Sequence, residues 1–243
     1  MNRPQNINIK DWQILKEKYP NNLEQIVSKI KSGYPIQYLI GDVEFLDCLI
    51  DVDDRVLIPR FETEYLVSLV IDYAKKHFNH KISTIDLGTG SGCIAIALKK
   101  HLNSQVAAVD ISLDALDLAR KNALKNNVEI EFIHQDMLSD LNDNYDIIIS
   151  NPPYIPHDGY VEDKVLKYEP HLALFAEDNG LYFYKQIINK HLKNLNKPGL
   201  MAFEIGDNES SDLQMFLDAN INLKYEFASD LTARTRYLFI FNE

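Results

Sequence analysis

Short apolar runs alternate with longer stretches of three-to-four-residue apolar spacing from about residue 81 to the end of the chain. The short runs are typical of buried strands, and the longer stretches are typical of helices. This alternation predicts an α/β fold in which helices cover both faces of a parallel sheet. The predicted strands are 82–87, 106–110, 129–134, 146–150, 200–205, 222–227 and 237–241, and the helices between them are 92–102, 113–126, 181–195 and 210–220.

The beginning of the chain has a different pattern. Helical spacing over 9–19 and 23–31 ends at a glycine and a proline, which stop helices. Two β-rich runs, 36–40 and 43–51, flank Gly41-Asp42 and indicate a hairpin.

These patterns predict three parts of the chain. We expect a short helical domain over 1–33, a β-hairpin linker over 34–56, and a seven-stranded Rossmann-like α/β domain over 57–243. The last part would open with a helix that ends near His77.

Composition narrows the class of protein. The chain has 243 residues, 46% of them hydrophobic and 25% charged, which fits one α/β domain with a small appendage. The net charge of −11 disfavours a large nucleic-acid-binding face, which needs clustered lysine and arginine. We therefore expect nucleic acid not to be the direct substrate, and a basic protein partner would be favoured.

Other composition signals exclude further classes. No apolar stretch approaches the roughly 18 to 20 residues that span a bilayer, and the start lacks the apolar segment of a signal peptide. We therefore expect a cytoplasmic protein without membrane association. Cys48 and Cys93 lie far apart in apolar surroundings and are interpreted as core residues. The histidines are scattered, so we predict no metal.

The sequence Asn151-Pro152-Pro153-Tyr154 directly follows the fourth predicted strand. A planar nitrogen is a poor nucleophile unless its protons are held by acceptors. The Asn151 side-chain carbonyl and the Pro152 backbone carbonyl can accept those two protons. The prolines stiffen the turn, and the Tyr154 ring offers a stacking face. The alternative is a simple proline-rich turn after a strand.

A glycine-rich turn, Asp86-Leu87-Gly88-Thr89-Gly90-Ser91-Gly92, follows the first predicted core strand. Its glycines allow close approach of a ligand at the carboxyl edge of the sheet. The rival dinucleotide pattern G-x-G-x-x-G differs, because Cys93 stands where its last glycine would fall. Asp86 suits a positively charged ligand such as S-adenosylmethionine and would repel a pyrophosphate.

Two further residues fit the same ligand. Asp110 ends the second strand, where a carboxylate can accept both hydroxyls of a ribose, although it can also simply open the next turn. The segment Gln135-Asp136-Met137, after the third strand, is positioned to border an adenine at its amino group or its flat face. We predict a methyl-donor site beside a nitrogen-acceptor site, in which alignment and hydrogen-bond acceptors promote in-line displacement without a dedicated general base.

With these motifs the chain resembles the HemK-type release-factor glutamine methyltransferases, over about residues 33–243. The more specific matches are residues 35–41, 57–64, 86–98 and 151–155, and Glu169-Pro170 with Ala173-Leu174. The resemblance implies a class I fold and S-adenosylmethionine-dependent methylation of the glutamine amide nitrogen in the Gly-Gly-Gln loop of peptide-chain release factors.

The resemblance also implies residue roles. Donor contacts would come from Asp86, Gly88, Thr89, Gly90, Ser91, Gly92, Asp110, Met137 and Asn151. The glutamine would be held by Asn151, Pro152, Pro153 and Tyr154, of which Asn151, Pro152 and Tyr154 would be catalytic.

The chain departs from the family pattern in three places. Phe61 replaces a proline, the turn at 231–234 lacks a glycine that easily adopts positive φ, and the N-terminal helical bundle is short. Arg60, Glu62 and Glu64 would form either a lid or ion-paired entrance near the amino-acid end of the donor, or an exposed helix start in which the helix dipole favours the acids.

Two other functions stay open at this point. An adenine or guanine amino group in RNA or DNA offers the same planar nitrogen. A non-catalytic S-adenosylmethionine-binding module would keep the glycine turn without turnover.

Overall fold

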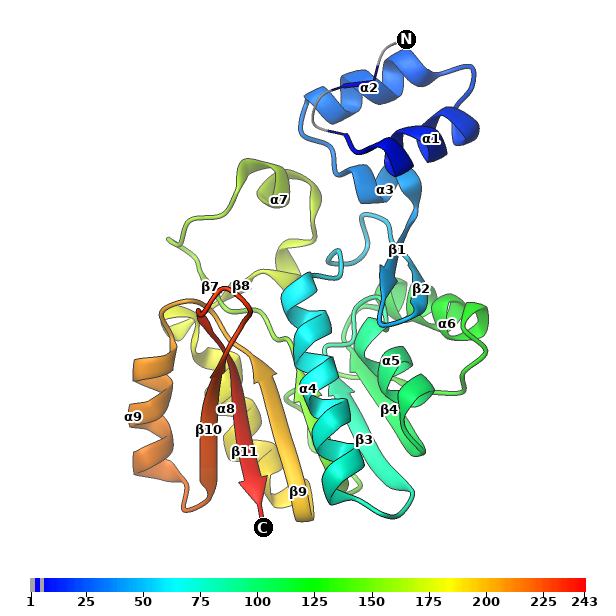
Figure 1. Ribbon diagram of the computed structural model, residues 1–243. Coiled ribbons are helices and arrows are strands. Elements are labelled where there is room, and N and C mark those ends of the chain that lie inside the picture. Colours follow the sequence, from blue (N-terminus) through cyan, green and yellow to red (C-terminus); the bar gives the residue numbers. More distant parts are fainter. Residues whose placement is uncertain (1–2, 5–6) are drawn as a thin grey trace.

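A seven-stranded sheet forms the centre of the computed structural model, which describes residues 3–4 and 7–243 (Figure 1). The strand order is β10-β11-β9-β6-β3-β4-β5, which confirms the predicted α/β class with seven core strands. The strands are β3 Ile82–Leu87, β4 Ser104–Asp110, β5 Glu131–His134, β6 Tyr145–Ser150, β9 Leu195–Glu204, β10 Lys224–Ser229 and β11 Thr235–Asn242.

The expectation of a parallel sheet is wrong for one strand. β11 pairs antiparallel with both β10 and β9, whereas β3, β4, β5, β6 and β9 pair in parallel. A tight turn connects β10 to β11, and such a turn can only join antiparallel strands. The sheet is therefore mixed.

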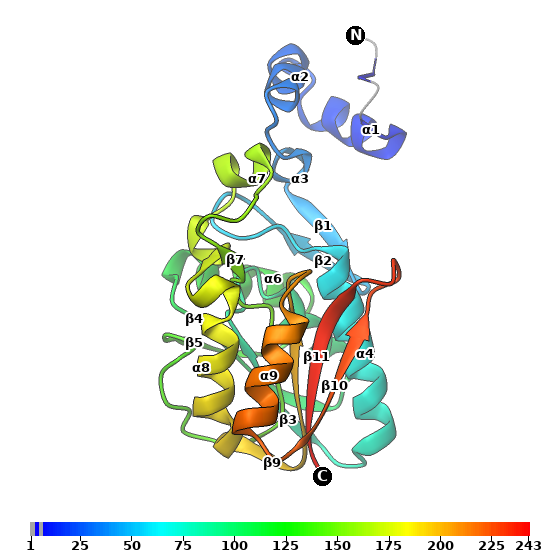
Figure 2. The ribbon, with the colours of Figure 1, turned by 90° about the vertical axis from the view of Figure 1, so that its left-hand side faces the viewer.

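Helices cover both faces of the sheet, as predicted (Figure 2). Ile147 and Ile149 of β6 pack into the cluster that includes α4, α5 and α6, and Ile148 packs into the cluster that includes α8 and α9. Alternate strand residues point to opposite faces, which explains why β6 is apolar throughout. The helices are α4 Phe61–His77, α5 Cys93–His101, α6 Leu113–Lys125, α8 Tyr182–His191 and α9 Ser210–Asn220.

The strand order reverses direction at β3. From β3 the chain proceeds outward through β4 and β5, and it then returns to the other side of β3 with β6 and β9. In open α/β sheets ligands bind beyond the carboxyl ends of the strands at such a reversal. The predicted site residues follow β3, β4, β5 and β6, so the topology gathers them at one edge.

The N-terminal region contains α1 Ile9–Lys18 and α2 Leu23–Lys31, close to prediction, followed by α3 Ile36–Ile40. The prediction of a strand over 36–40 is wrong. A helical turn there lets Leu39 pack with α1 and α2 while Tyr38 packs into the main core, where its hydroxyl donates to the Val56 carbonyl at 2.7 Å. Gly41, with φ of +94°, ends this helix.

The hairpin lies further along than predicted. It consists of β1 Asp42–Phe45 and β2 Cys48–Asp51, and it turns at Leu46 and Asp47, both of which have positive φ. Gly41 was therefore misinterpreted as a hairpin turn when it is a helix end.

The segment after β6 holds short elements that the sequence did not predict. They are β7 Ile155–Pro156, α7 Asp163–Tyr168, η1 His171–Ala173, β8 Phe175–Ala176 and η2 Asp178–Gly180, and η3 Leu192–Asn194 follows α8. β7 pairs with β8 in parallel. The segment reaches the N-terminal helices, since the Tyr168 and Tyr34 rings lie 5.0 Å apart. In Figures 1 and 2, α7 lies beside α3.

Candidate active site

The glycine turn after β3 depends on backbone conformations that favour glycine. Gly88, Gly90 and Gly92 have φ of +79°, +54° and +83°. A Cβ atom at Gly90 would meet nothing within 4 Å, so this part of the turn is open to a ligand. At Gly88 a Cβ atom would lie 2.8 Å from the terminal methyl of Met137, which therefore packs closely against the turn.

Buried polar side chains brace the turn from below. Thr89 donates a hydrogen bond of 2.6 Å to the carboxylate of Asp86, and both side chains are buried. Burial raises the pKa of Asp86 to about 7. Asp86 is therefore only partly ionised at neutral pH and becomes fully charged above it, and its side chain has no exposed surface.

Asp110 lies directly beside the turn. One of its carboxylate oxygens accepts the Gly90 backbone N–H at 2.8 Å, and the other accepts the Ser112 backbone N–H at 2.9 Å. Burial raises the pKa of Asp110, while these backbone donors oppose that shift. Each oxygen keeps a second lone pair, so the carboxylate can still accept ligand hydroxyls.

These features fit a cationic ligand with a ribose. The turn is open at Gly90, and two carboxylates, Asp86 and Asp110, lie close to it. S-adenosylmethionine has a sulfonium, an ammonium and a ribose, so the residues present suit it.

The Asn-Pro-Pro-Tyr turn lies next to the glycine turn. The Ser150 hydroxyl donates to the Leu87 carbonyl at 2.6 Å, which joins the end of β6 to the end of β3. Pro152 and Pro153 are buried, whereas Asn151 and Tyr154 line a cavity of about 920 Å³. Burial raises the pKa of the Tyr154 hydroxyl, so it stays protonated at neutral pH.

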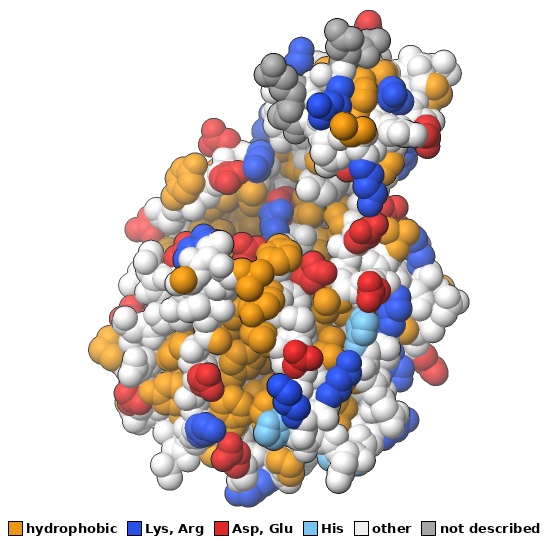
Figure 3. Space-filling model, viewed as in Figure 1, with side chains coloured by type: hydrophobic (Ala, Val, Ile, Leu, Met, Phe, Trp, Pro, Cys, Tyr) orange, Lys and Arg blue, Asp and Glu red, His pale blue; other side chains and the backbone are white. Residues whose placement is uncertain are grey.

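The cavity combines apolar and charged walls. The β7 and α7 segment and the ends of β9 and β11 surround it. Its charged residues are Arg60, Glu62, Glu162, Lys164, Glu204, Asp207, Glu209, Asp212 and Arg236. Figure 3 shows that the face seen in Figure 1 is hollowed below the N-terminal helices, with hydrophobic side chains in the hollow.

Ion pairs hold the residues around the start of α4. Arg60 contacts the buried carboxylate of Glu169 at 2.5 Å, and Glu169 also accepts the Ile58 backbone N–H at 3.1 Å. Glu62 lies 3.6 Å from Arg234. Arg60 and Glu62 are thus ion-paired at the cavity, as one of the two interpretations expected.

Glu64 differs from Arg60 and Glu62. Its carboxylate accepts the backbone N–H of Leu46 at 2.9 Å and so supports the hairpin turn.

The predicted residues fall into two groups. Asn151 and Tyr154 line the cavity, whereas the glycine turn, Asp110 and Met137 are outside its lining. The two groups meet at the Ser150–Leu87 hydrogen bond.

Sequence reasoning missed Thr63 and Glu204, which connect to Asn151 through hydrogen bonds. The available signal was that Glu204 ends β9, the strand next to β6, at the same edge as Asn151.

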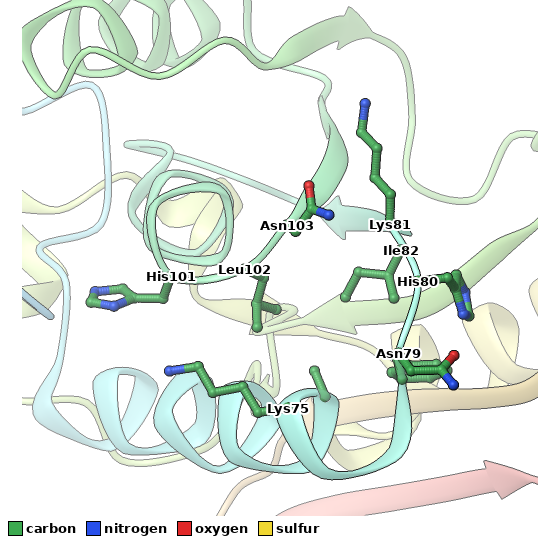
Figure 4. Close-up of a pocket in the computed structure, with 10 residues that line it drawn as sticks. Lys75, Asn79, His80, Lys81, Ile82, His101, Leu102 and Asn103 are labelled. Atoms are coloured by element: carbon green, nitrogen blue, oxygen red, sulfur yellow. The ribbon is translucent and has the colours of Figure 1, made fainter.

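A second cavity of about 410 Å³ lies at the opposite edge of the sheet, near the start of β3. It contains none of the predicted site residues. Figure 4 shows that the amino groups of Lys75 and Lys81 point in different directions, so they do not form a common anion site.

Within residues 3–4 and 7–243, no cluster of three or more His, Cys, Asp or Glu side chains could hold a metal. Cys48 and Cys93 are buried free thiols. In the same described part of the chain, no helix has the length and apolar character needed to cross a membrane.

Comparison with known proteins identifies the class. Residues 63–168 match the methyltransferase small domain family. The ribosomal protein L11 methylase from Lactobacillus delbrueckii superposes with a TM-score of 0.57 at 21% identity, covering 80% of this chain and 84% of that one. The protein is an S-adenosylmethionine-dependent methyltransferase with the Rossmann-like class I fold.

Closer relatives identify the family. The release factor glutamine methyltransferase of Lactococcus lactis is 40% identical over 86% of this chain and 79% of its own length. That of Flavobacterium psychrophilum is 45% identical over 75% of this chain and 66% of its own length. The chain belongs to the release factor glutamine methyltransferase family, which confirms the resemblance drawn from the motifs.

Proposed function

We propose that the protein transfers a methyl group from S-adenosylmethionine to the side-chain amide nitrogen of the glutamine in the Gly-Gly-Gln loop of a peptide-chain release factor. The observation that carries this proposal is the placement of Asn151, which lines a cavity and directly follows Ser150, whose hydrogen bond to Leu87 joins the end of β6 to the start of the glycine turn. The names of the relatives support the same acceptor.

The acceptor amide would be held by its two protons. The Asn151 side-chain carbonyl would accept one, and the Pro152 backbone carbonyl would accept the other. Pro152 and Pro153 are buried, so the turn that presents these carbonyls is stiff. The Tyr154 ring, partly buried in the cavity wall, would stack on the amide plane.

The donor would lie along the glycine turn. The open side of the turn at Gly90 would take the amino-acid part of the ligand, Asp110 would accept its ribose hydroxyls, and Met137 would border its adenine. Bound S-adenosylmethionine would supply a methyl group on a positively charged sulfur. The aligned amide nitrogen would attack the methyl carbon in line, and the sulfur would leave as a neutral thioether.

The residues would promote transfer by alignment and by electrostatics. As nitrogen gains positive charge, the carbonyl oxygens of Asn151 and Pro152 would stabilise that charge. The alkylated amide becomes acidic and loses its proton to solvent, so no side chain has to act as a general base.

Two expectations from the sequence belong to the same proposal. We infer that the protein acts in the cytoplasm, where release factors work. We also infer a division into residues 1–33, 34–56 and 57–243, supported by a separate apolar cluster in the N-terminal helices, although Leu39 of the linker also joins that cluster.

The test is transfer of radiolabelled methyl to a purified release factor, compared with a release factor in which the loop glutamine is changed to alanine. Label on the first alone is the expected result. Label on RNA or DNA, with none on either release factor, would replace this acceptor by a nucleic acid base. S-adenosylmethionine binding without transfer to any of these would indicate a binding module.

A further inference from the structure

A chain of two hydrogen bonds connects Asn151 to a buried acid. The Asn151 side-chain amide nitrogen lies 3.0 Å from the Thr63 hydroxyl, and that hydroxyl lies 2.6 Å from the Glu204 carboxylate. Thr63 is 3% exposed and Glu204 is 2% exposed. Neither residue belongs to the Asn-Pro-Pro-Tyr turn: Thr63 lies in the first turn of α4, and Glu204 ends β9.

The chemistry of the three groups fixes which group donates and which accepts in each of the two hydrogen bonds. An ionised carboxylate can only accept, so the Thr63 hydroxyl proton points to Glu204. The hydroxyl lone pairs then face Asn151, which must present its NH₂ group to Thr63. The Asn151 carbonyl oxygen is therefore turned away from Thr63 and left for another donor.

This orientation is the one that the proposed acceptor chemistry needs. A flipped Asn151 amide would direct its own N–H groups at the N–H groups of a substrate amide, and donor would meet donor. We propose that Thr63 and Glu204 are positioning residues that hold the Asn151 carbonyl oxygen ready to accept a proton of the substrate glutamine amide. This inference rests on the proposed function.

The charge on Glu204 makes the orientation dependent on pH. Burial raises the pKa of Glu204 to about 7, while the Thr63 hydroxyl opposes the shift. A protonated Glu204 can donate to the Thr63 hydroxyl, and the Thr63 proton is then free to bind the Asn151 carbonyl oxygen. The direction of both hydrogen bonds can therefore reverse. The charged and titratable groups that face Glu204 are Arg60, Glu62, Tyr154, Tyr184, Arg236 and Tyr237.

The sign of the pH effect follows. The productive orientation requires ionised Glu204, so the transfer rate falls as the pH drops through the Glu204 pKa near 7. In Glu204→Gln, this fall disappears, and the rate at pH 8 drops about tenfold because the amide no longer enforces one direction. A pH profile of Glu204→Gln identical to that of the unmodified protein would overturn the inference.

Thr63 variants separate the hydroxyl from its packing. We expect Thr63→Val, which keeps the shape, to lower kcat about 10- to 100-fold with little change in S-adenosylmethionine affinity, and Thr63→Ser to retain most of the activity. Thr84→Val is the matched control. Thr84 is also buried, but it lies on β3 and its hydroxyl donates a hydrogen bond to the Gln105 carbonyl, away from Asn151. Equal losses in Thr63→Ser and Thr63→Val would refute a role for the hydroxyl.

A measurement without substrate completes the test. The Asn151 side-chain NH₂ resonance, assigned by its loss in Asn151→Ala, is followed by NMR from pH 5 to 9. We expect a shift with a midpoint near 7 that is absent in Glu204→Gln. If the resonance does not shift, the inference is contradicted even when methyl transfer occurs. If the unmodified protein transfers no methyl group, the proposed function alone is contradicted.

Discussion

The backbone N–H of Gly90 donates a hydrogen bond of 2.8 Å to the carboxylate of Asp110. Gly90 belongs to the turn after β3, and Asp110 ends β4, the neighbouring strand. Asp110 thus orients the open part of the glycine turn, and in the proposed function the same carboxylate would accept the ribose hydroxyls. We propose that donor binding depends on both effects, because the same carboxylate shapes the turn and would supply hydrogen-bond acceptors to the ligand.

Asp110→Ala is expected to raise the dissociation constant of S-adenosylmethionine about tenfold or more, since it removes two acceptors and the Gly90 contact. The maximal rate at saturating donor changes less. Titration calorimetry measures the affinity directly. Asp114→Ala, at an exposed position in the first turn of α6, is the control and should bind the donor normally. An unchanged dissociation constant in Asp110→Ala would count against the ribose contact.

Asn151→Ala is expected to lower methyl transfer about a hundredfold or more, because it removes the acceptor that aligns the substrate amide. Donor binding should change less, so the loss should appear mainly in kcat. Single-turnover assays with a release factor separate the two effects. Asn142→Ala, on the exposed loop before β6, serves as the control. A variant with near-normal transfer would refute the assigned role of Asn151.

The placement of the glycine turn and Asp110 at one edge of the sheet could be predicted because its signals are local, while their contacts with the donor stay a prediction. Gly88 to Gly92 follow a strongly apolar strand, and Asp110 ends the next one, so strand pairing alone places them together. Asn151 was found in the same way, at the end of β6. Each prediction required only a strand end and a residue type.

Other features depended on contacts that a local pattern does not contain. The Thr63–Glu204 hydrogen bond joins residues 141 positions apart, and neither residue carries a distinctive spacing. Residues 36–40 are too short for periodicity to decide, and packing of Tyr38 and Leu39 into two different clusters favours a helix. The strands β7 and β8 are only two residues long and are separated by irregular backbone. The alternation of apolar runs and helical spacing along the sequence therefore did not reveal them.

Ala233→Gly is expected to stabilise the protein. Ala233 adopts φ of +64° in the turn between β10 and β11, and a left-handed conformation costs an L-residue about 1 to 2 kcal/mol. The greater freedom of glycine in the unfolded chain offsets part of this gain, so we expect about 0.5 to 1 kcal/mol. Urea unfolding measures this change in the free energy of unfolding. Equal or lower stability of Ala233→Gly would show that Ala233 is not strained.

Asn122→Ala is expected to destabilise the protein by about 2 to 3 kcal/mol, because buried backbone groups lose their partners. Asn122 is fully buried. It accepts from the Asp51 backbone N–H and donates to the backbone carbonyls of Asp51 and Ser91, which ties α6 to the hairpin and to the glycine turn.

Asn126→Ala is the matched comparison for Asn122→Ala. Asn126 makes similar bonds to Leu49 one helical turn later but is only half-buried, so water can replace it. Urea unfolding of both variants should show the larger loss for Asn122→Ala. Weaker donor binding should accompany that loss alone, because only Asn122 contacts Ser91 in the glycine turn. Equal losses would show that burial does not set the cost.

Asp86→Asn is expected to become progressively more stable relative to the unmodified protein as the pH rises from about 4 to about 7. Burial raises the pKa of Asp86 from 3.8 to about 7, so the unfolded chain releases this proton at lower pH than the folded chain. Folding is therefore penalised by as much as about 1.4 kcal/mol per pH unit across that window, and the penalty is constant above it. Asparagine does not titrate and can still accept from Thr89. Urea unfolding of both proteins between pH 4 and pH 8 measures the difference, and a difference that stays constant with pH would mean that Asp86 titrates normally in the folded state.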